Sequence, residues 1–290
     1  MTGPGTANPA SQGIMLMLGA ILCFSLMDAC AKELSDSLPI PQILWARYAG
    51  QTTLVLLFLN RRVPAELRTK RVGLHLLRTA FILIATAMFF TGLAHIGLAE
   101  ATAIISLNPV FMTLGAALIL GETLGRRRLF GIAAALVGAL LVIKPGSDVF
   151  TAFAILPLIG AVCLSGFALT SRYLGTSESI WTSMLYTGLI SSTLLTAIQP
   201  FFWVTPSGSV MLLMLALAFS GAIGQFLMIS ALMRAEASQV APFIYSGLIF
   251  ATLWGVLFFG EYPDVLTLTG GLVIILAGIY VWYRETRATS

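Results

Sequence analysis

The chain has 290 residues, of which 58% are hydrophobic and only 10% are charged. Soluble domains carry about 25% charged residues, so this composition excludes a soluble globular protein and predicts an all-α polytopic membrane protein. The net charge of +4 does not indicate a nucleic-acid partner, because the Lys and Arg residues lie in short loops between apolar runs, where they set orientation in a bilayer.

The predicted elements begin after a polar N-terminal stretch. Residues 1–12 contain no charged side chain and lack the basic region of a cleaved signal peptide, so we expect a disordered cytoplasmic tail. Ten apolar stretches follow, each near the roughly 20 residues that cross a hydrocarbon core. The predicted transmembrane helices cover 13–34, 40–60, 72–93, 99–120, 128–144, 151–172, 179–199, 209–232, 238–259 and 266–283. A second cytoplasmic tail is expected over 285–290.

Basic residues predict which ends of these helices face the cytoplasm. If the N-terminus is cytoplasmic, twelve Lys and Arg residues fall in cytoplasmic segments, whereas only Lys32 and Lys144 fall in external ones. Positively charged loops stay on the cytoplasmic side of a membrane. We therefore expect both termini in the cytoplasm and an even number of spans; the family resemblance given below implies a multi-pass protein of a bacterial inner membrane.

Two halves of the chain are weak copies of each other. At offsets of 138 to 140 residues, the matched positions include Lys32 with Arg172, Tyr48 with Tyr186, Gly121-Glu122 with Gly260-Glu261, and Gly131 with Gly270. Each half holds five predicted spans, and five is odd, so the second half must enter the membrane from the opposite side. Many secondary transporters are built from such inverted repeats. The expected units are a first five-helix repeat over 13–145 and a second, inverted one over 146–284.

Several residues of the chain resemble the signature of a known family. They are the stretch Gly97-Leu-Ala-Glu100-Ala-Thr-Ala-Ile-Ile-Ser-Leu-Asn108-Pro109-Val-Phe, the pairs Gly121-Glu122 and Gly260-Glu261, and the basic residues Arg47 and Arg78. They resemble the EamA-type signature of the drug/metabolite transporter superfamily, in which the chain is most similar to bacterial exporters of aromatic amino acids. The resemblance implies a carrier in which spans 1–4 and 6–9 surround a central pocket and spans 5 and 10 lie at the periphery.

Charged residues inside the predicted spans need a partner or a wet cavity, because an unpaired charge in a bilayer is costly. Asp28 and Arg47 lie at similar depth on either side of the first hairpin. They form either a structural ion pair or a charged wall that meets the carboxylate or ammonium of an amino acid. Gln51 extends this polar face inward, whereas Lys32 and Arg78 are expected to snorkel to water.

Polar residues near the middle of later spans are the other candidates for a pocket, which needs a few convergent polar groups among apolar walls. Pro109 and Pro242 interrupt helical hydrogen bonding in spans 4 and 9 and free backbone carbonyls there. Aromatic rings nearby would suit a flat substrate by stacking. The predicted substrate-binding residues are Asp28, Arg47, Gln51, Asn108, Tyr186, Gln225, Tyr245, Ser246 and Trp254.

The absence of several catalytic and nucleotide-binding motifs limits the classes of function that we predict. The sequence has no Walker A motif, no HExxH and no GxSxG, so we predict neither ATP drive nor a membrane enzyme, and no cofactor or metal. The predicted function is export of small metabolites, favouring aromatic amino acids, by alternating access. A small-molecule substrate and the lipid bilayer are the expected partners, and no oligomer is required. A broad-specificity drug or nucleotide-sugar carrier is one alternative, and a channel or membrane receptor is another.

Overall fold

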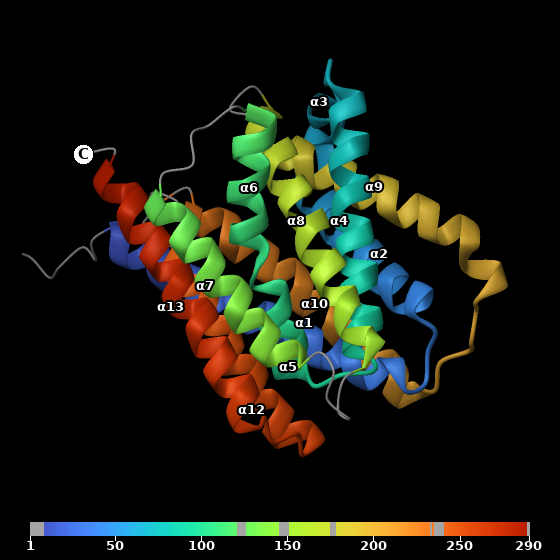
Figure 1. Cartoon of the computed structure of the whole chain (residues 1–290). Coiled ribbons are helices and arrows are strands. Elements are labelled where there is room, and N and C mark those ends of the chain that lie inside the picture. The colour runs from blue at the N-terminus through green and yellow to red at the C-terminus, as the bar shows by residue number, and fades with distance from the viewer. Residues whose placement is uncertain are drawn as a thin grey trace, which may run out of the picture.

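A computed structural model describes residues 9–120, 126–144, 151–174, 178–232, 234 and 241–288, and all regular structure in these ranges is helical (Figure 1). The elements are α1 (Pro9–Ser35), α2 (Ile40–Leu59), η1 (Asn60–Arg62), α3 (Val63–Glu66), α4 (Val72–Leu93), α5 (Leu98–Ile105), α6 (Asn108–Leu120), α7 (Arg126–Ile143), η2 (Ala152–Ala154), α8 (Ile155–Leu174), α9 (Ile180–Ile198), η4 (Gln199–Phe201), α10 (Gly208–Leu232), η5 (Ala241–Tyr245), α12 (Ser246–Phe259) and α13 (Val265–Ala288).

The long helices lie where the apolar runs predict them. Taking α5 with α6 and η5 with α12, the described helices group into the ten predicted segments. Four stretches are long and apolar enough to cross a membrane unaided, namely Ser11–Ser35, Val72–Leu93, Ala152–Ser171 and Gly208–Met228, and shorter apolar helices accompany them. Large apolar side chains on the outer surface, such as Leu118 (85% exposed) and Phe130 (71% exposed), suit a lipid environment because water would disfavour such patches.

The helices at both ends of the chain are longer than predicted. α1 begins at Pro9, inside the expected tail, because proline at the first helical position has its fixed φ and needs no hydrogen bond for its nitrogen. α13 continues to Ala288, because the residues that follow its apolar part are good helix formers. Residues 1–8 and 289–290 of the two expected tails lie outside the described residues.

One predicted span in each half is interrupted at a similar position. The predicted fourth span is divided into α5 and α6, and Pro109 is the second residue of α6. In the second half, the 3₁₀ helix η5 contains Pro242 and gives way to α12 at Ser246. That position corresponds to the start of α6, although the second half has Gly247 where the first has Asn108. The interruption therefore does not require the same residues in both halves.

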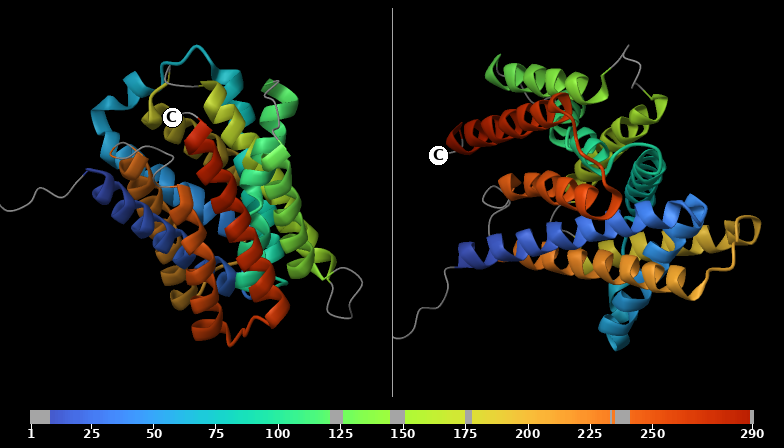
Figure 2. Two further views of the ribbon diagram at one scale, coloured as in Figure 1. Left: turned by 60° about the vertical axis from the view of Figure 1, so that its left-hand side comes forward. Right: turned by 90° about the horizontal axis from the view of Figure 1, so that it is seen from below.

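Helix packing follows the same correspondence. α1 packs against α10 and α12, and α8, its counterpart, packs against α4 and α6. α2 pairs with its counterpart α9, and α7 with its counterpart α13. Figures 1 and 2 show α7 and α13 side by side at one edge of the bundle, as the family resemblance implies for spans 5 and 10. Each of these contacts that a helix of one half makes is thus repeated by its counterpart in the other half.

Candidate substrate site

Two opposite charges lie on neighbouring helices of the first half. Asp28 is on α1 and Arg47 is on α2, and both side chains are half-buried. The carboxylate and the guanidinium are near enough to interact electrostatically. Among the ion pairs of the described residues, however, none joins them directly. The predicted structural ion pair is therefore absent from the described residues, and the other interpretation, a charged wall, stays a prediction.

Aromatic rings flank the Arg47 guanidinium. Its central carbon lies 5.2 Å from the ring centroid of Tyr48 and 5.6 Å from that of Phe90, and a cation is attracted to the face of an aromatic ring. The Nε atom of Arg47 is buried and has no hydrogen-bond partner in the part of the chain that is described. A buried donor left unsatisfied is costly, so this guanidinium suits an acceptor brought by a ligand.

Trp254 reaches from the second half of the chain to α1. Its indole N–H donates a hydrogen bond to the Ser25 hydroxyl at 3.0 Å, and its ring stacks on Phe258 with centroids 5.4 Å apart. Ser25 precedes Asp28 by one helical turn, so the two side chains share a face of α1. The hydrogen bond therefore places the predicted aromatic residue about one turn from the predicted acid.

Tyr245 and Ser246 do not join this group. Tyr245 lies in η5, and its hydroxyl is so close to Gly278 of α13 that a Cβ atom there would collide with it. The ring turns toward α13 because Gly278 leaves space for it. The Ser246 hydroxyl donates to the backbone carbonyl of Phe243 at 2.7 Å, so its hydrogen bond is local. The sequence pattern could not give the direction in which either side chain points from its helix.

Tyr186 lies away from the charged residues, near the start of α9. Its hydroxyl donates to the Leu67 carbonyl at 2.9 Å, and its ring stacks on His75 with centroids 4.8 Å apart. Leu67 follows α3, in the connection between α2 and α4. Tyr186 therefore fixes a connecting segment at one end of the bundle and is separate from Asp28 and Arg47.

The three remaining predicted residues lie inside the bundle. Asn108 begins α6, and its backbone carbonyl accepts a hydrogen bond from the Ser165 hydroxyl on α8 at 2.9 Å. This contact joins the start of α6 to α8, and the freeing of backbone carbonyls by Pro109 stays a prediction. Gln51 is buried on α2, one turn beyond the charged residue, and Gln225 is half-buried on α10, which packs against α1.

Lys32 closes one end of the bundle by joining elements from both halves. Its ammonium pairs with Glu261 at 2.8 Å and donates to the carbonyls of Leu93 at 3.1 Å and Ile96 at 2.7 Å. The other oxygen of Glu261 accepts the Leu98 N–H, at the start of α5, at 2.8 Å. The expectation that Lys32 snorkels to water is wrong, because three acceptors satisfy its ammonium within the protein. We call this network the seal.

Glu261 reaches the seal because α12 stops abruptly. Gly260 adopts a left-handed conformation with φ of 63°, and the N–H of Glu261 turns back to the Gly255 carbonyl at 2.9 Å. Side chains other than hydrogen disfavour this conformation, which is why glycine commonly ends helices. The pair Gly260-Glu261 is therefore a helix stop followed by a sealing carboxylate, whereas the matched pair Gly121-Glu122 lies outside the described residues.

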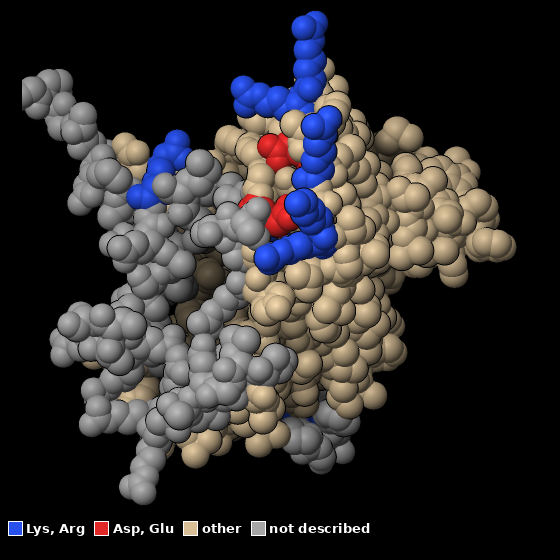
Figure 3. Space-filling model, turned by 90° about the horizontal axis from the view of Figure 1, so that it is seen from above, with Lys and Arg blue, Asp and Glu red and all other residues tan. Residues whose placement is uncertain are grey.

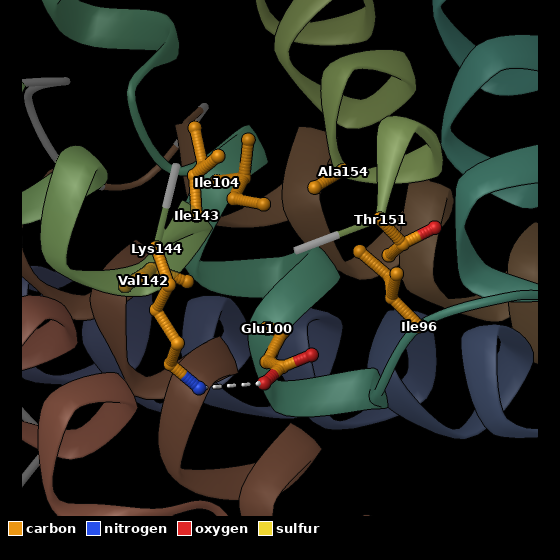
Figure 4. Close-up of a pocket in the computed structure, with 8 residues that line it drawn as sticks. All are labelled: Ile96, Glu100, Ile104, Val142, Ile143, Lys144, Thr151 and Ala154. Atoms are coloured by element: carbon orange, nitrogen blue, oxygen red, sulfur yellow. Dashed lines mark hydrogen bonds and ion pairs between the residues drawn. The ribbon is translucent and has the colours of Figure 1, made fainter. Parts of the chain in front are cut away.

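A second charged group reinforces the same end. Lys144 lies 3.0 Å from Asp264 and 3.4 Å from Glu100, and Figure 4 shows Lys144 and Glu100 pointing toward each other beside a cavity. This cavity of about 20 Å³ has room for one water molecule and none for a metabolite. The backbone N–H and side chain of Thr267, with Lys144, lower the pKa of Asp264 to about 2.

Arg78 joins helices at the opposite end. Its Nε donates to the Ser171 hydroxyl on α8 at 2.7 Å, and one terminal nitrogen donates to the Ser183 carbonyl on α9 at 3.1 Å. The guanidinium also lies 4.5 Å from the ring centroid of Phe167. The expected snorkelling of Arg78 is therefore wrong, because acceptors on two neighbouring helices hold its guanidinium inside the bundle.

The end that carries α3 is basic. Viewed from that end, Figure 3 shows Lys and Arg side chains gathered on one part of the surface. The seal lies at the other end, and the ion pairs of Lys144 lie at that same end. The described residues thus carry a charged network that closes one end of the bundle and exposed cations at the other.

Comparison with known proteins identifies the family. A model of the EamA-like transporter family matches residues 11–144 and again residues 151–284. The chain belongs to the EamA-like transporter family. The two matches correspond to the two halves recognised in the sequence, and they cover almost all of the described helices.

Individual relatives differ in their named substrates. The chain is 32% identical to the pseudopaline exporter CntI of Pseudomonas aeruginosa, over 92% of this chain and 95% of that protein. It is 28% identical to a riboflavin transporter of Vibrio cholerae, over 95% and 94%, and 23% identical to an S-adenosylmethionine uptake transporter of Rickettsia felis, over 96% and 95%. These likenesses support transport of a small metabolite across a membrane. The narrower similarity to aromatic amino acid exporters stays a prediction.

One solved structure shares the fold. It is described as "Crystal structure of protein", is 18% identical, and superimposes with a TM-score of 0.68 over 97% of this chain and 99% of that one. Because the likeness extends over both chains almost entirely, the whole helical arrangement is common to the two proteins.

Proposed function

We propose that this EamA-family protein is a secondary carrier that exports a small zwitterionic metabolite, with aromatic amino acids as the favoured class. The observation that carries the proposal is the pair of opposite charges, Asp28 and Arg47, which lack a direct ion pair within the described residues. An amino acid would place its carboxylate at Arg47 and its ammonium at Asp28, and its ring against Trp254. Few convergent polar groups among apolar walls are typical of metabolite pockets.

The proposed mechanism is alternating access between two inverted five-helix repeats. The matched helix packing of the two halves supports it, since pseudo-equivalent halves can rock about a shared central site. The seal at Lys32 and Glu261 supports a state that is closed at that end. In the proposed orientation, both termini and the basic end face the cytoplasm of a bacterial inner membrane, because basic loops remain on that side.

Cysteine labelling tests the orientation. Ser207 lies before α10 and Ala65 lies in α3, and both are exposed. In a variant without the native cysteines, a cysteine at position 207 should react with an impermeant thiol reagent added to intact cells. A cysteine at position 65 should react only after the membrane is opened. The reverse pattern would overturn the orientation and leave the substrate proposal untouched.

A binding panel tests the substrate class. Thermal unfolding of the detergent-purified protein would be followed with tryptophan, phenylalanine, alanine, riboflavin and S-adenosylmethionine, because a ligand that binds only the folded state raises the unfolding temperature. We expect tryptophan and phenylalanine to stabilise the protein more than alanine. Equal shifts for alanine and tryptophan would refute the aromatic preference. A shift with riboflavin alone would assign the site to a flat-ringed substrate without an amino-acid group.

Flux measurements separate a carrier from a channel. In liposomes, entry of the stabilising ligand should saturate with concentration, and the same ligand loaded on the opposite side should accelerate it. A carrier exchanges sides with its site occupied, whereas a channel lets solute flow without such a step. Linear flux that is insensitive to the opposite side would contradict alternating access.

A further inference from the structure

The connection between α2 and α4 carries an unusual concentration of exposed cations. We call residues 60–71, which include η1 and α3, the basic segment. All five of its cations are exposed, namely Arg61, Arg62, Arg68, Lys70 and Arg71. None of them is in an ion pair within the described residues. Five cations and one acid, Glu66, give the segment a net charge of +4, and Figure 3 shows Lys and Arg side chains gathered at this end of the bundle.

The acids nearest to this surface are engaged elsewhere. Glu66, inside the segment, accepts a hydrogen bond from the Thr182 hydroxyl at 2.7 Å. Glu178 accepts one from the Thr69 hydroxyl at 2.6 Å and lies 3.7 Å from the His75 ring. These contacts fasten the basic segment to the beginning of α9. The cations are therefore presented by a fixed backbone, and the two neighbouring carboxylates accept hydrogen bonds from threonine hydroxyls.

Exposed aromatic and aliphatic side chains lie directly beside the segment. Phe58, at the end of α2, is 65% exposed and stacks on Trp181 of α9 with centroids 4.9 Å apart. The ring centroid of Phe226 of α10 lies 6.2 Å from that of Phe58. Leu57, which precedes Phe58, is 70% exposed. Tryptophan is enriched at the level where acyl chains meet headgroups, which is the level that Trp181 indicates here. The cations of the segment are then at headgroup level.

We propose that the basic segment is a docking surface for anionic phospholipid headgroups, with the acyl chains of the bound lipid lying along Phe58 and its aromatic neighbours. Assignment to the cytoplasmic leaflet rests on the orientation proposed above. The charge complementarity is direct, because each Lys or Arg near an anionic membrane surface strengthens attachment about fivefold. Orientation alone requires basic residues on this side, but it does not require a fixed segment whose cations lie beside an aromatic belt.

Quenching by brominated lipid tests the proposal. The full chain, with Trp181 as its only tryptophan, would be reconstituted into vesicles of phosphatidylcholine and phosphatidylglycerol. Two preparations would contain the same lipids in the same proportions and differ only in which lipid carries bromine on its acyl chains. We expect stronger quenching when phosphatidylglycerol is brominated, and we expect concentrated salt to reduce the difference, because salt screens exposed charges.

Two matched variants make the test specific. Arg61→Gln with Arg62→Gln should abolish most of the preference for phosphatidylglycerol, whereas Arg61→Lys with Arg62→Lys should keep it. Both positions are exposed, so neither variant is expected to disturb folding, and three cations of the segment remain to hold the orientation. Equal quenching by the two lipids in the wild type would overturn the proposal, and so would an unchanged preference in the glutamine variant. These vesicles carry both lipids in both leaflets, so the result does not depend on the orientation.

Discussion

The two halves of the bundle share a backbone plan but contribute different chemistry to its centre. In the first half, α1 and α2 carry Asp28 and Arg47. At the corresponding offsets of 140 and 138 residues, α8 and α9 carry Ala168 and Leu185, and Leu185 is only 1% exposed. For the aromatic residue of the proposed site the difference is reversed: the second half carries Trp254, and the corresponding position in the first half is Gly115.

This difference separates two demands on a carrier. Two similar states require two similar halves, and the packing of α1 with α10 is therefore matched by that of α8 with α4. Recognition of one substrate does not require symmetry, since a zwitterion has one anionic group, one cationic group and one side chain. Under the proposed function, the first half supplies the charges and the second half supplies the ring.

The largest expected effect comes from giving the first half the chemistry of the second. Loss of a desolvated charge that contacts a charged partner costs about 2–5 kcal/mol, so Arg47→Leu should lower affinity for the stabilising ligand about 100-fold. The measurement is the ligand-dependent shift in unfolding temperature. Leu185→Met, a volume-conserving change at the matching position, should leave affinity unchanged. Comparable losses in both variants would contradict a one-sided site.

Breaking the contact between the halves should reduce stability. Hydrogen bonds to charged groups contribute about 1.5–3 kcal/mol, so Lys32→Met should lower the free energy of unfolding in detergent by about that amount. Glu261→Gln should cost less, because the glutamine carbonyl can still accept the Leu98 N–H. If Lys32→Met unfolds at the same denaturant concentration as the wild type, the seal does not hold the halves together.

A smaller effect should distinguish two aromatic residues of the second half. Aromatic contacts contribute about 0.5–1.5 kcal/mol beyond burial, so Trp254→Leu should weaken binding of a ring-bearing ligand about 3- to 10-fold. Tyr245→Phe should leave binding unchanged, because its hydroxyl lies against Gly278 and not beside the charged residues. Titration of both variants with the same ligand would decide. A larger loss in Tyr245→Phe would return Tyr245 to the site.

The smallest expected effect is a pH dependence at the closed end. The folded protein holds the pKa of Asp264 at about 2, below the ordinary value of 3.8. A lowered carboxyl pKa stabilises the folded state above the unfolded pKa, and this contribution is lost as pH falls from about 4 toward 2. Thermal unfolding near neutral pH and near pH 3 should therefore show a steeper acid loss in the wild type than in Asp264→Asn. Parallel losses would exclude a contribution from this group.

Sequence reasoning was most successful where one physical constraint dominates. A span must be long and apolar enough to cross a bilayer, so the predicted helix over 72–93 coincides with α4, whereas the outer ends of α1 and α13 extend beyond the prediction. The direction of a side chain about its helix axis has no comparable constraint. Tyr245 turns to α13 because a glycine lies there, and Tyr186 turns to the segment between α2 and α4.

The sequence analysis also did not predict the ion pair between Lys32 and Glu261. Lys32 and Glu261 are far apart in the sequence, and Lys32 was expected to reach water without a partner from the second half. The repeat did contain a signal, because Gly260-Glu261 and Lys32 both belong to matched positions of the two halves. Two matched charged positions at the same predicted membrane face were sufficient reason to test them as partners.

The seal also imposes an order on biogenesis. When the first helices enter the membrane during synthesis, Lys32 can use the carbonyls of Leu93 and Ile96 as soon as α4 is in place. Its carboxylate partner follows α12 and is translated more than two hundred residues later. The Gly260 stop must form before Glu261 can reach the lysine. Closure of this end is thus a late step of assembly, and a nascent chain that ends before α12 has an ammonium without its counter-charge.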